Sequence, residues 1–339
     1  MEDNQYAQRE KESPFNTPRR LKNPATPSSR RLLPSTRRKS VSSSQESGFE
    51  GLLKKQWRIY TLSPLYNFKR HRTALIRCER SLDAALSQAQ STSSDPLNSR
   101  PEKSSFSFYE DLKFHPDDPP GLRIQVHARN GPGEVANLVM EAFLVCVEPS
   151  ASPIPEQLQN RFTFYPVALI SGNKARSAVL LEWLEKHFDC HSDVLTLSDN
   201  DLKFMLVLSS AFMTDMKGPP VLLQYSLEDV CEGIGSINCK LDTDYCKQLW
   251  ERLFSTSIAE KEEIFKDEVH LFMDHLEELL EHLMRIFFKK LTLSEVGTSA
   301  AYVSHLGKIK IFSPSAVYMA LHHLCETANS RFLELMSRE

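Results

Sequence analysis

Four short stretches of the sequence combine residue types that can do chemistry. SGNK (171–174) places a serine three residues before a lysine, and EGIGS (232–236) contains the G-x-G of a phosphate-binding turn. CH (190–191) and HHLC (322–325) contain types that bind zinc. Each lacks the companion motif, third glycine or second ligand cluster that its chemistry requires. The sequence therefore predicts no catalytic residue, no metal site and no cofactor.

The amino-terminal tail offers a different kind of site. TPRR (17–20) presents Thr17 in a proline-directed phosphorylation pattern, and RRKSV (37–41) presents Ser40 in a pattern that basophilic kinases accept. A phosphate at either position would weaken contacts of this arm with an anionic partner. We predict Thr17 and Ser40 as phosphorylation sites.

The composition of the tail predicts disorder. Residues 1–48 are rich in Ser, Pro, Thr and Arg and have few large aliphatic side chains, so burial cannot offset the entropy cost of ordering them. Ten basic and five acidic residues give this segment a charge of +5, which leaves −8 on the rest of a chain whose net charge is −3. The tail is predicted as a disordered basic arm on an acidic body.

Cysteine usage and hydropathy narrow the class of protein. The seven cysteines are odd in number, widely scattered and never in a C-x-x-C pair, which does not match a secreted disulfide framework. The start of the chain is polar, and no apolar run approaches the length of a membrane span. These features indicate a cytosolic or nuclear protein without a membrane partner. The kinase motifs and the basic tail together favour a nuclear protein over a metabolic enzyme.

Behind the tail, KKQWRIYTLSPLYNF (54–68) packs four aromatic side chains into fifteen residues. Such a run can be a docking motif, a base-stacking platform or the first strand of a core. The neighbouring sequence is rich in strand-forming patterns, which favours the core. Trp57 and Ile59 are then expected to face inward, with Pro64 ending the element.

The rest of the chain predicts an α+β fold. Alternating or continuous apolar runs predict strands at 105–114, 122–129, 141–148 and 162–170, the last two central in a sheet. Helical spacing predicts helices at 173–188, 198–212, 242–254 and 264–290. A polar stretch at 86–105 is predicted as a loop or linker. Two strands that turn near Gly307, followed by a helix after Pro314, are expected at the end.

Five blocks, in the same order, resemble the centromere protein L family of vertebrates. They are LLKKQWRIYTLSPLYNF (52–68), EAFLVCVE (141–148), ALISGNKARSAVLLEWLEKHFDC (168–190), VHLFMDHLEELLEHLMRIFF (269–288) and GTSAAYVSHLGKIKIF (297–312). The resemblance runs from about residue 50 to the end. It implies a non-enzymatic subunit of the inner kinetochore at nuclear centromeric chromatin, with a role in chromosome segregation. The fold implied is α+β, with a curved antiparallel sheet and packed helices.

The resemblance also implies partners. Members of the family pair with centromere protein N through their carboxyl-terminal regions, partly by joining β-strands. The pair forms a DNA-facing groove at the centromeric nucleosome and its linker DNA, and centromere protein C and other inner-kinetochore subunits bind it. The expected regions of this chain are the tail (1–48), an α+β region (49–240) and a helical and β-hairpin dimerisation region (241–339).

Carried onto this chain, the resemblance implies a pairing edge within residues 291–313. The expected contact residues are Tyr302, Val303, Ile309, Ile311 and Phe312, with Lys308 and Lys310 on the solvated side of the hairpin. The alternative is an internal hairpin buried under the last helix. Basic residues that could contact DNA phosphates are Lys54, Lys55, Arg58, Lys69, Arg70, Arg72, Lys174 and Arg176.

Two other functions stay open on the sequence. One is a freestanding nuclear DNA-binding protein that uses the basic tail, and the charge of the acidic body argues against it. The other is a hydrolase or transferase with unfamiliar motifs, and the missing combination of nucleophile, base and oxyanion stabiliser argues against that.

Overall fold

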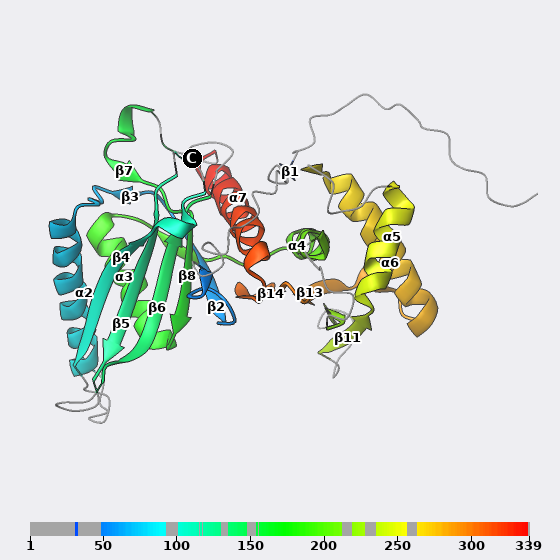
Figure 1. Cartoon of the computed structure of the whole chain (residues 1–339), viewed down its shortest axis with the longest axis horizontal. Helices are drawn as coiled ribbons and strands as arrows, with labels where there is room; N and C mark the ends of the chain where they lie inside the picture. The colour runs from blue at the N-terminus through cyan, green and yellow to red at the C-terminus, as the bar shows by residue number, and fades with distance from the viewer. Residues whose placement is uncertain are drawn as a thin grey trace, which may run out of the picture.

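One open antiparallel sheet of eleven strands runs through the described part of the protein (Figure 1). The computed structural model describes residues 31–32, 49–92, 101–114, 116, 118–129, 135–147, 154, 156–211, 219–227, 235–255 and 263–337. In spatial order the strands are β11 (Ser236–Leu241), β10 (Val221–Ser226), β13 (Thr292–Gly297), β14 (Ala301–Ser304), β15 (Lys308–Ile311), β2 (Trp57–Leu62), β8 (Val167–Gly172), β6 (Asn137–Val145), β5 (Gly121–Ala128) and β4 (Glu102–Tyr109); β9 (Ser192–Val194) also pairs with β2. The predicted α+β class, with an antiparallel sheet and packed helices, is confirmed.

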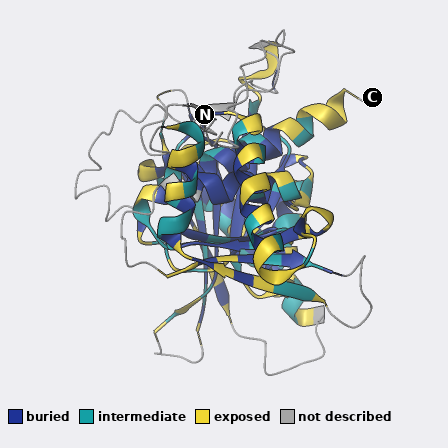
Figure 2. Cartoon of the chain, turned by 90° about the vertical axis from the view of Figure 1, so that its right-hand side faces the viewer, coloured by how far each residue is buried: buried dark blue, intermediate teal, exposed yellow. Residues whose placement is uncertain are grey.

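Helices cover both faces of this sheet, but at different ends (Figures 1 and 2). The helices are α2 (Arg72–Thr92), α3 (Lys174–Phe188), α4 (Asp199–Ala211), α5 (Thr243–Phe254), α6 (Lys266–Met284) and α7 (Val317–Met336). One core lies between α2, α3 and the strands β4, β5, β6 and β8. The other lies under α4 to α7 on the opposite face, where the strands from β11 to β2 bury their alternate side chains.

Short elements complete the fold. Two-stranded pairs join β1 (Arg31–Leu32) to β12 (Glu263–Ile264) and β3 (Leu65–Tyr66) to β7 (Phe162–Thr163). Turns of 3-10 helix are η3 (Glu110–Leu112), η4 (Glu156–Leu158), η6 (Phe288–Lys290) and η7 (Pro314–Ala316).

The central strands follow from their continuous apolar sequence. In β6, Ala142 and Leu144 face the α2–α3 core, whereas Phe143 and Val145 face the core under α4 to α7. A strand buried on both faces needs apolar residues at every position. The prediction that 141–148 and 162–170 supply central strands is therefore confirmed by β6 and β8.

The aromatic run at the start of the folded region belongs to the core. Trp57 and Ile59 on β2 are fully buried, and the indole nitrogen of Trp57 donates to the Leu52 carbonyl at 2.9 Å. The strand ends at Leu62, two residues before Pro64. This burial leaves Trp57 inaccessible for base stacking or docking.

Helix boundaries follow local capping chemistry. The Asn173 side chain accepts a hydrogen bond from the backbone of Ala175 at the start of α3, and Ser198 with Asp201 forms a reciprocal cap at the start of α4. The helix predicted at 264–290 is shorter, because Arg285 adopts a left-handed backbone conformation (φ 60°) that ends α6.

The prediction of a loop or linker at 86–105 is wrong at both ends, where α2 covers residues 86–92 and β4 covers 102–105, while 93–100 lie outside the described residues. Helix α2 continues to Thr92, and Leu75, Cys78, Leu82 and Leu86 on its inner face pack in the α2–α3 core. The Ser- and Gln-rich end of this helix has the composition of a loop. Packing against β4, which begins at Glu102, overrides that preference.

The sheet also crosses the boundary expected between residues 240 and 241. Strand β10 lies before this boundary and pairs with β13 behind it, while β15 near the carboxyl end pairs with β2 near the start. Strands from both expected regions therefore share one sheet.

Candidate partner and nucleic-acid interfaces

The predicted pairing hairpin forms, but it is not an edge of the sheet. Strands β14 and β15 pair with each other, β14 also pairs with β13, and β15 also pairs with β2. The side chains of Val303, Ile309 and Ile311 are buried in the core under α4 to α7. The expectation that a different polypeptide completes this hairpin is wrong for this fold, because β2 of the same chain occupies the place.

The other two predicted contact residues lie at the margin of the core. Tyr302 is half-buried on the outer side of the sheet, and burial together with the nearby Glu295 carboxylate raises the pKa of its phenol. Phe312 is half-buried after the end of β15, with the Lys310 ammonium 5.4 Å from its ring centre. Neither residue lies on an unpaired strand.

A free edge does occur elsewhere, at β11. In the described ranges this strand pairs with β10 alone. The backbone of Leu227 donates to Gly235, so the hydrogen-bonded rungs toward β10 fall at Ile237, Cys239 and Leu241. The intervening residues Ser236, Asn238 and Lys240 direct their backbone N–H and C=O groups outward. We call these outward groups the β11 edge.

Exposed apolar side chains lie beside the β11 edge. Leu283, Met284 and Phe287, at the end of α6 and just behind it, are 69%, 39% and 72% exposed; we call them the apolar patch. The Cys239 and Met284 sulfur atoms are 3.7 Å apart, which joins the patch to β11. Phe288, the next residue, is buried against Tyr225 and anchors the segment.

Neither the β11 edge nor the apolar patch was predicted from the sequence. Leu283 and Phe287 continue the apolar stripe of α6, so the sequence predicts that they are buried. The helix runs past the end of the core before it stops at Arg285, and its last apolar residues reach solvent. The signal in the sequence is the apolar IFF (286–288), which follows Arg285 and exceeds what one helical face can bury.

Basic side chains gather on the outer side of the same strands. Lys308 on β15 pairs with Arg58 on β2. Five residues in register on neighbouring strands form a second row across the sheet: Lys310, Tyr302, Gly297, Leu222 and Lys240. Paired residues point to the same side of a sheet, and this side is opposite to that of Val303 and Ile309. Arg58, Lys240, Lys308 and Lys310 are exposed or half-buried, and we call them the basic sheet face.

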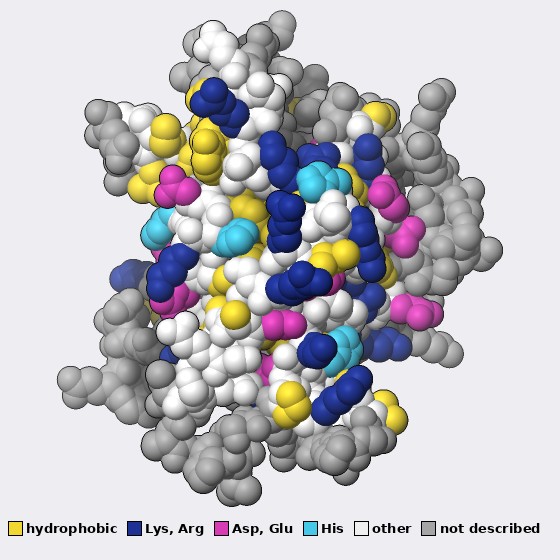
Figure 3. Space-filling view, turned by 90° about the vertical axis from the view of Figure 1, so that its left-hand side faces the viewer, with side chains coloured by type: hydrophobic (Ala, Val, Ile, Leu, Met, Phe, Trp, Pro, Cys, Tyr) yellow, Lys and Arg dark blue, Asp and Glu magenta, His cyan; other side chains and the backbone are white. Residues whose placement is uncertain are grey.

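The other basic candidates divide into two groups. Lys69, Arg70, Arg72 and Lys174 are exposed near the amino-terminal ends of α2 and α3, and Lys54 is exposed near β15. The side of the molecule that carries α2 shows many Lys and Arg side chains (Figure 3). Lys55 and Arg176 instead contact buried carboxylates, Lys55 that of Glu141 and Arg176 that of Glu102, each at 2.6 Å. These two have structural partners inside the protein.

Some predicted sites have no structural counterpart to describe. Thr17 and Ser40 lie outside the described residues. Within the described ranges, no three His, Cys, Asp or Glu side chains come together as a metal site, and no helix is long and apolar enough to cross a bilayer.

Comparison with known proteins gives one family. The family model described as Centromere protein L matches residues 51–339. The chain is 27% identical over 291 residues to centromere protein L of Bos taurus, covering 83% of this chain and 80% of the relative. It is 25% identical over 288 residues to that of Homo sapiens (82% and 79%) and 25% identical over 283 residues to that of Gallus gallus (83% and 80%).

Proposed function

This chain belongs to the centromere protein L family, and from that premise we propose that it is a non-enzymatic inner-kinetochore subunit that pairs with centromere protein N. Membership gives it a centromere and kinetochore role on chromosomes in the nucleus. The observation that supports pairing with centromere protein N is the unpaired β11 edge, which lies beside the apolar patch.

The β11 edge suits the addition of a strand from the partner. An unpaired strand offers a row of backbone donors and acceptors that another extended segment can complete. Its outward groups at Ser236, Asn238 and Lys240 repeat every second residue, as an added antiparallel or parallel strand requires. Strand addition here extends the sheet without disturbing the buried hairpin of β14 and β15.

The apolar patch supplies the affinity that backbone pairing lacks. Exposed aromatic and aliphatic side chains that cluster on a soluble protein mark interaction sites. Phe287 and Leu283 are the most exposed large apolar residues of α6 and the segment behind it. A partner strand on β11 would lie next to them, so both could become buried as the anchor of the interface.

The basic sheet face supports the DNA part of the proposal. Arg58, Lys308 and Lys310 lie on strands that continue the sheet away from β11, on the side opposite the helices α4 to α7. Cations on one side of a sheet, here with the Glu295 carboxylate among them, can contact a phosphate backbone and give affinity that does not depend on sequence. We propose that the pair holds centromeric nucleosomal and linker DNA here.

The proposal extends to further subunits. On the family resemblance, centromere protein C and other inner-kinetochore proteins are partners of the assembled pair, which supports kinetochore assembly and chromosome segregation. The Lys54 side chain and the exposed cations at the start of α2 and α3 remain proposed DNA contacts beside the basic sheet face.

A substitution at Asn238 tests the β11 edge. Its backbone N–H points away from β10, so proline removes an outward donor and spares the bonds that hold β11 in the sheet. Asn238→Ala keeps the donor and is the matched control. We expect Asn238→Pro to weaken the affinity for co-expressed centromere protein N by about tenfold or more, and Asn238→Ala to leave it unchanged.

Size-exclusion chromatography and calorimetric titration measure this effect. Circular dichroism and the melting temperature of each isolated variant show whether the fold is retained. If Asn238→Pro and Phe287→Asp both pair as the wild type does, the β11 edge and the apolar patch do not form the interface. If the wild type fails to pair with centromere protein N at all, the proposed heterodimer is wrong.

A further inference from the structure

Strand β4 ends the sheet on the side away from β11, and its register shows which of its backbone groups face outward. The backbone of Arg129 donates to the Pro101 carbonyl, so every second residue after Pro101 bonds to β5. The residues that direct their backbone N–H and C=O groups away from β5 are Glu102, Ser104, Phe106 and Phe108. We call these outward groups the β4 edge.

Two carboxylates of α2 occupy the middle of the β4 edge. The backbone N–H of Ser104 donates to Asp83 at 2.6 Å, and that of Phe106 donates to Glu79 at 3.0 Å. The Ser104 hydroxyl adds bonds to the Asp83 carboxylate at 2.7 Å and to the Glu79 carbonyl at 2.9 Å. The two central N–H groups of this edge are therefore already paired within the chain.

The spacing of the two carboxylates matches that of the strand. Outward groups of an antiparallel strand repeat every two residues, about 6.8 Å, and residues four apart on a helix lie about 6.0 Å apart along its axis. Glu79 and Asp83 are four apart, and the earlier one bonds to the later strand residue, so α2 runs opposite to β4. The carboxylates thus replace the carbonyl groups that an added antiparallel strand would supply.

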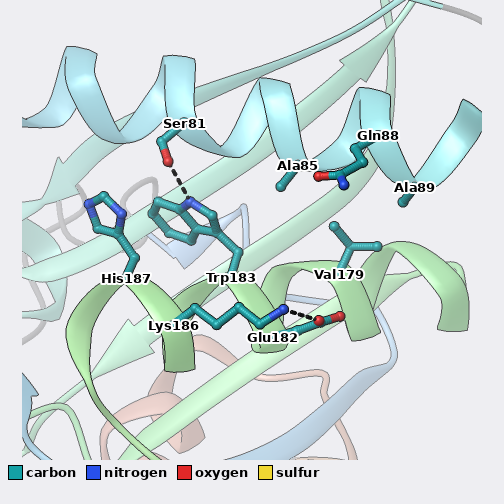
Figure 4. A pocket seen from close by; sticks show the side chains of 9 residues that line it. All are labelled: Ser81, Ala85, Gln88, Ala89, Val179, Glu182, Trp183, Lys186 and His187. Carbon is teal, nitrogen blue, oxygen red and sulfur yellow. Dashed lines mark hydrogen bonds and ion pairs between the residues drawn. The ribbon is translucent and has the colours of Figure 1, made fainter.

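The body of α2 lies on the face of the sheet. Its inner side chains, Leu75, Cys78, Leu82 and Leu86, pack in the α2–α3 core. Ser81 points toward α3, where the Trp183 indole donates to its hydroxyl at 3.0 Å (Figure 4). Residues two apart on a helix lie about 200° apart around its axis, so Glu79 and Asp83 point away from α3 and toward the β4 edge. A strand adds in the plane of the sheet, where these two side chains lie.

We propose that Glu79 and Asp83 close the β4 edge, so that this sheet accepts an added strand at β11 and not at β4. An uncapped β4 edge could pair with the β11 edge of a second copy of the chain. Such head-to-tail pairing leaves one free edge at each end of the assembly, so it does not close and continues to grow. The cap limits the sheet to one added strand. This inference rests on the β11 edge of the proposed function.

Paired substitutions in α2 test the cap. Glu79→Ala with Asp83→Ala removes both acceptors, and alanine preserves the helix. Glu79→Gln with Asp83→Asn keeps an acceptor oxygen at each position and is the matched control. Sedimentation velocity measures the size of the full chain alone over a series of concentrations.

We expect the alanine pair to grow with concentration, with an average mass at least about twofold above that of the wild type at the highest concentration. The amide control should match the wild type at every concentration. Adding Asn238→Pro to the alanine pair should abolish the growth, because proline removes an outward donor of the β11 edge.

Hydrogen exchange at low concentration gives a local readout. The amides of Ser104 and Phe106 should exchange at least about tenfold faster in the alanine pair than in the wild type. The amides of Lys103 and Ser105 bond to β5 and should stay protected, which makes them internal references. Glu79→Ala alone leaves the bonds from Ser104 to Asp83 in place and should accelerate Phe106 only. Circular dichroism and the melting temperature check that α2 remains folded.

Two results would overturn the proposal. One is a folded alanine pair that has the size of the wild type at every concentration, which would leave Glu79 and Asp83 with the attachment of α2 as their role. The other is growth that persists after Asn238→Pro is added, because the second copy would then not use its β11 edge. The chain is measured without centromere protein N, so a failure of that pairing alters neither result.

Discussion

At the scale of single residues, two basic side chains have internal roles that their sequence context does not reveal. Glu141 on β6 is 2% exposed and accepts from Lys55 at 2.6 Å and from Arg123 at 2.7 Å. Burial alone would raise the pKa of Glu141, but the hydrogen bonds from Lys55 and Arg123 outweigh it and lower that pKa. Lys55 is thus needed to hold a buried carboxylate, which argues against a primary role in contacting DNA.

Replacing Glu141 tests this network through the pH dependence of stability. A carboxyl whose folded pKa is lowered stabilises the fold above its unfolded pKa, and this stabilisation is lost as the pH falls through the folded value. We expect Glu141→Gln to lower the free energy of unfolding by about 2 kcal/mol at neutral pH. The difference from the wild type should shrink as the pH falls below about 4.3, the ordinary glutamate value.

Urea denaturation at a series of pH values measures the difference. Glu182→Gln is the matched control, because Glu182 is an exposed partner of Lys186 on α3 and should change stability by less than about 0.5 kcal/mol. A Glu141→Gln difference that stays constant down to acid pH would show that the charge of Glu141 does not contribute.

At the scale of elements, the position of the β14–β15 hairpin decides what its residues can do. The turn is tight: Gly307 has a φ of 68°, and a Cβ there would lie 2.5 Å from the Leu195 carbonyl oxygen. This close approach seats the hairpin against the segment that follows β9 and delivers β15 to β2. A hairpin held on both sides by its own chain contributes to the core and not to an open interface.

A substitution at Ile309 distinguishes a hairpin that belongs to the core from a hairpin that pairs with a partner protein. The side chain of Ile309 is fully buried between β14 and β2, so Ile309→Asp places an unpaired charge in the core. We expect this variant to be insoluble or unfolded, with a loss of at least about 4 kcal/mol of stability. Circular dichroism and the melting temperature check the outcome.

The neighbouring turn residue provides the comparison. Leu306 is 53% exposed in the same hairpin, and Leu306→Asp should retain the fold with a change of about 0.5 kcal/mol or less. A well-folded Ile309→Asp protein that has lost only its partner would restore the hairpin as the pairing element.

At the scale of the whole molecule, the twisted sheet separates its surfaces. Helices cover one face at one end and the other face at the other end, which leaves the basic sheet face open beside the α2–α3 layer (Figures 1 and 2). The β11 edge terminates the same sheet. A strand added there would extend the sheet that carries Lys308 and Lys310, so the proposed partner and DNA contacts would share one continuous surface.

The salt dependence of DNA binding tests the basic sheet face. Each cation that meets a phosphate releases counterions, so removing one such cation reduces the slope of log affinity against log salt by about 1. We expect Arg58→Gln and Lys308→Gln, made in the pair with centromere protein N, each to weaken duplex binding and reduce this slope. The effect should be similar on unrelated DNA sequences, because phosphates carry no sequence information.

Lys266 serves as the control for this experiment. It is exposed at the start of α6, on the side of the sheet opposite to the basic sheet face, so Lys266→Gln should leave the slope unchanged. Equal slopes for the wild type, Arg58→Gln and Lys308→Gln would show that DNA does not lie on this face.

Local patterns in the sequence predict many of the elements and much of the core. The aromatic run at Trp57, the amphipathic stripe of α6 and the turn at Gly307 each follow from short-range pattern, since helix and strand periods and turn chemistry are local properties. The end of α2 was predicted as a loop because its Ser- and Gln-rich sequence is polar, and the packing of α2 against β4 overrides that local preference.

Which surfaces of the protein are free depends on its tertiary fold. The periodicity of the sequence does not predict that β2 pairs with the β14–β15 hairpin or that β11 lies at the end of the sheet. It also does not predict the contact between Lys55 and Glu141, which are 86 residues apart in the chain. These are interactions between segments distant in the chain, and they depend on the order of strands in the assembled sheet. The residues that can contact a partner are those whose backbone and side chains are not already paired with distant segments of the same chain.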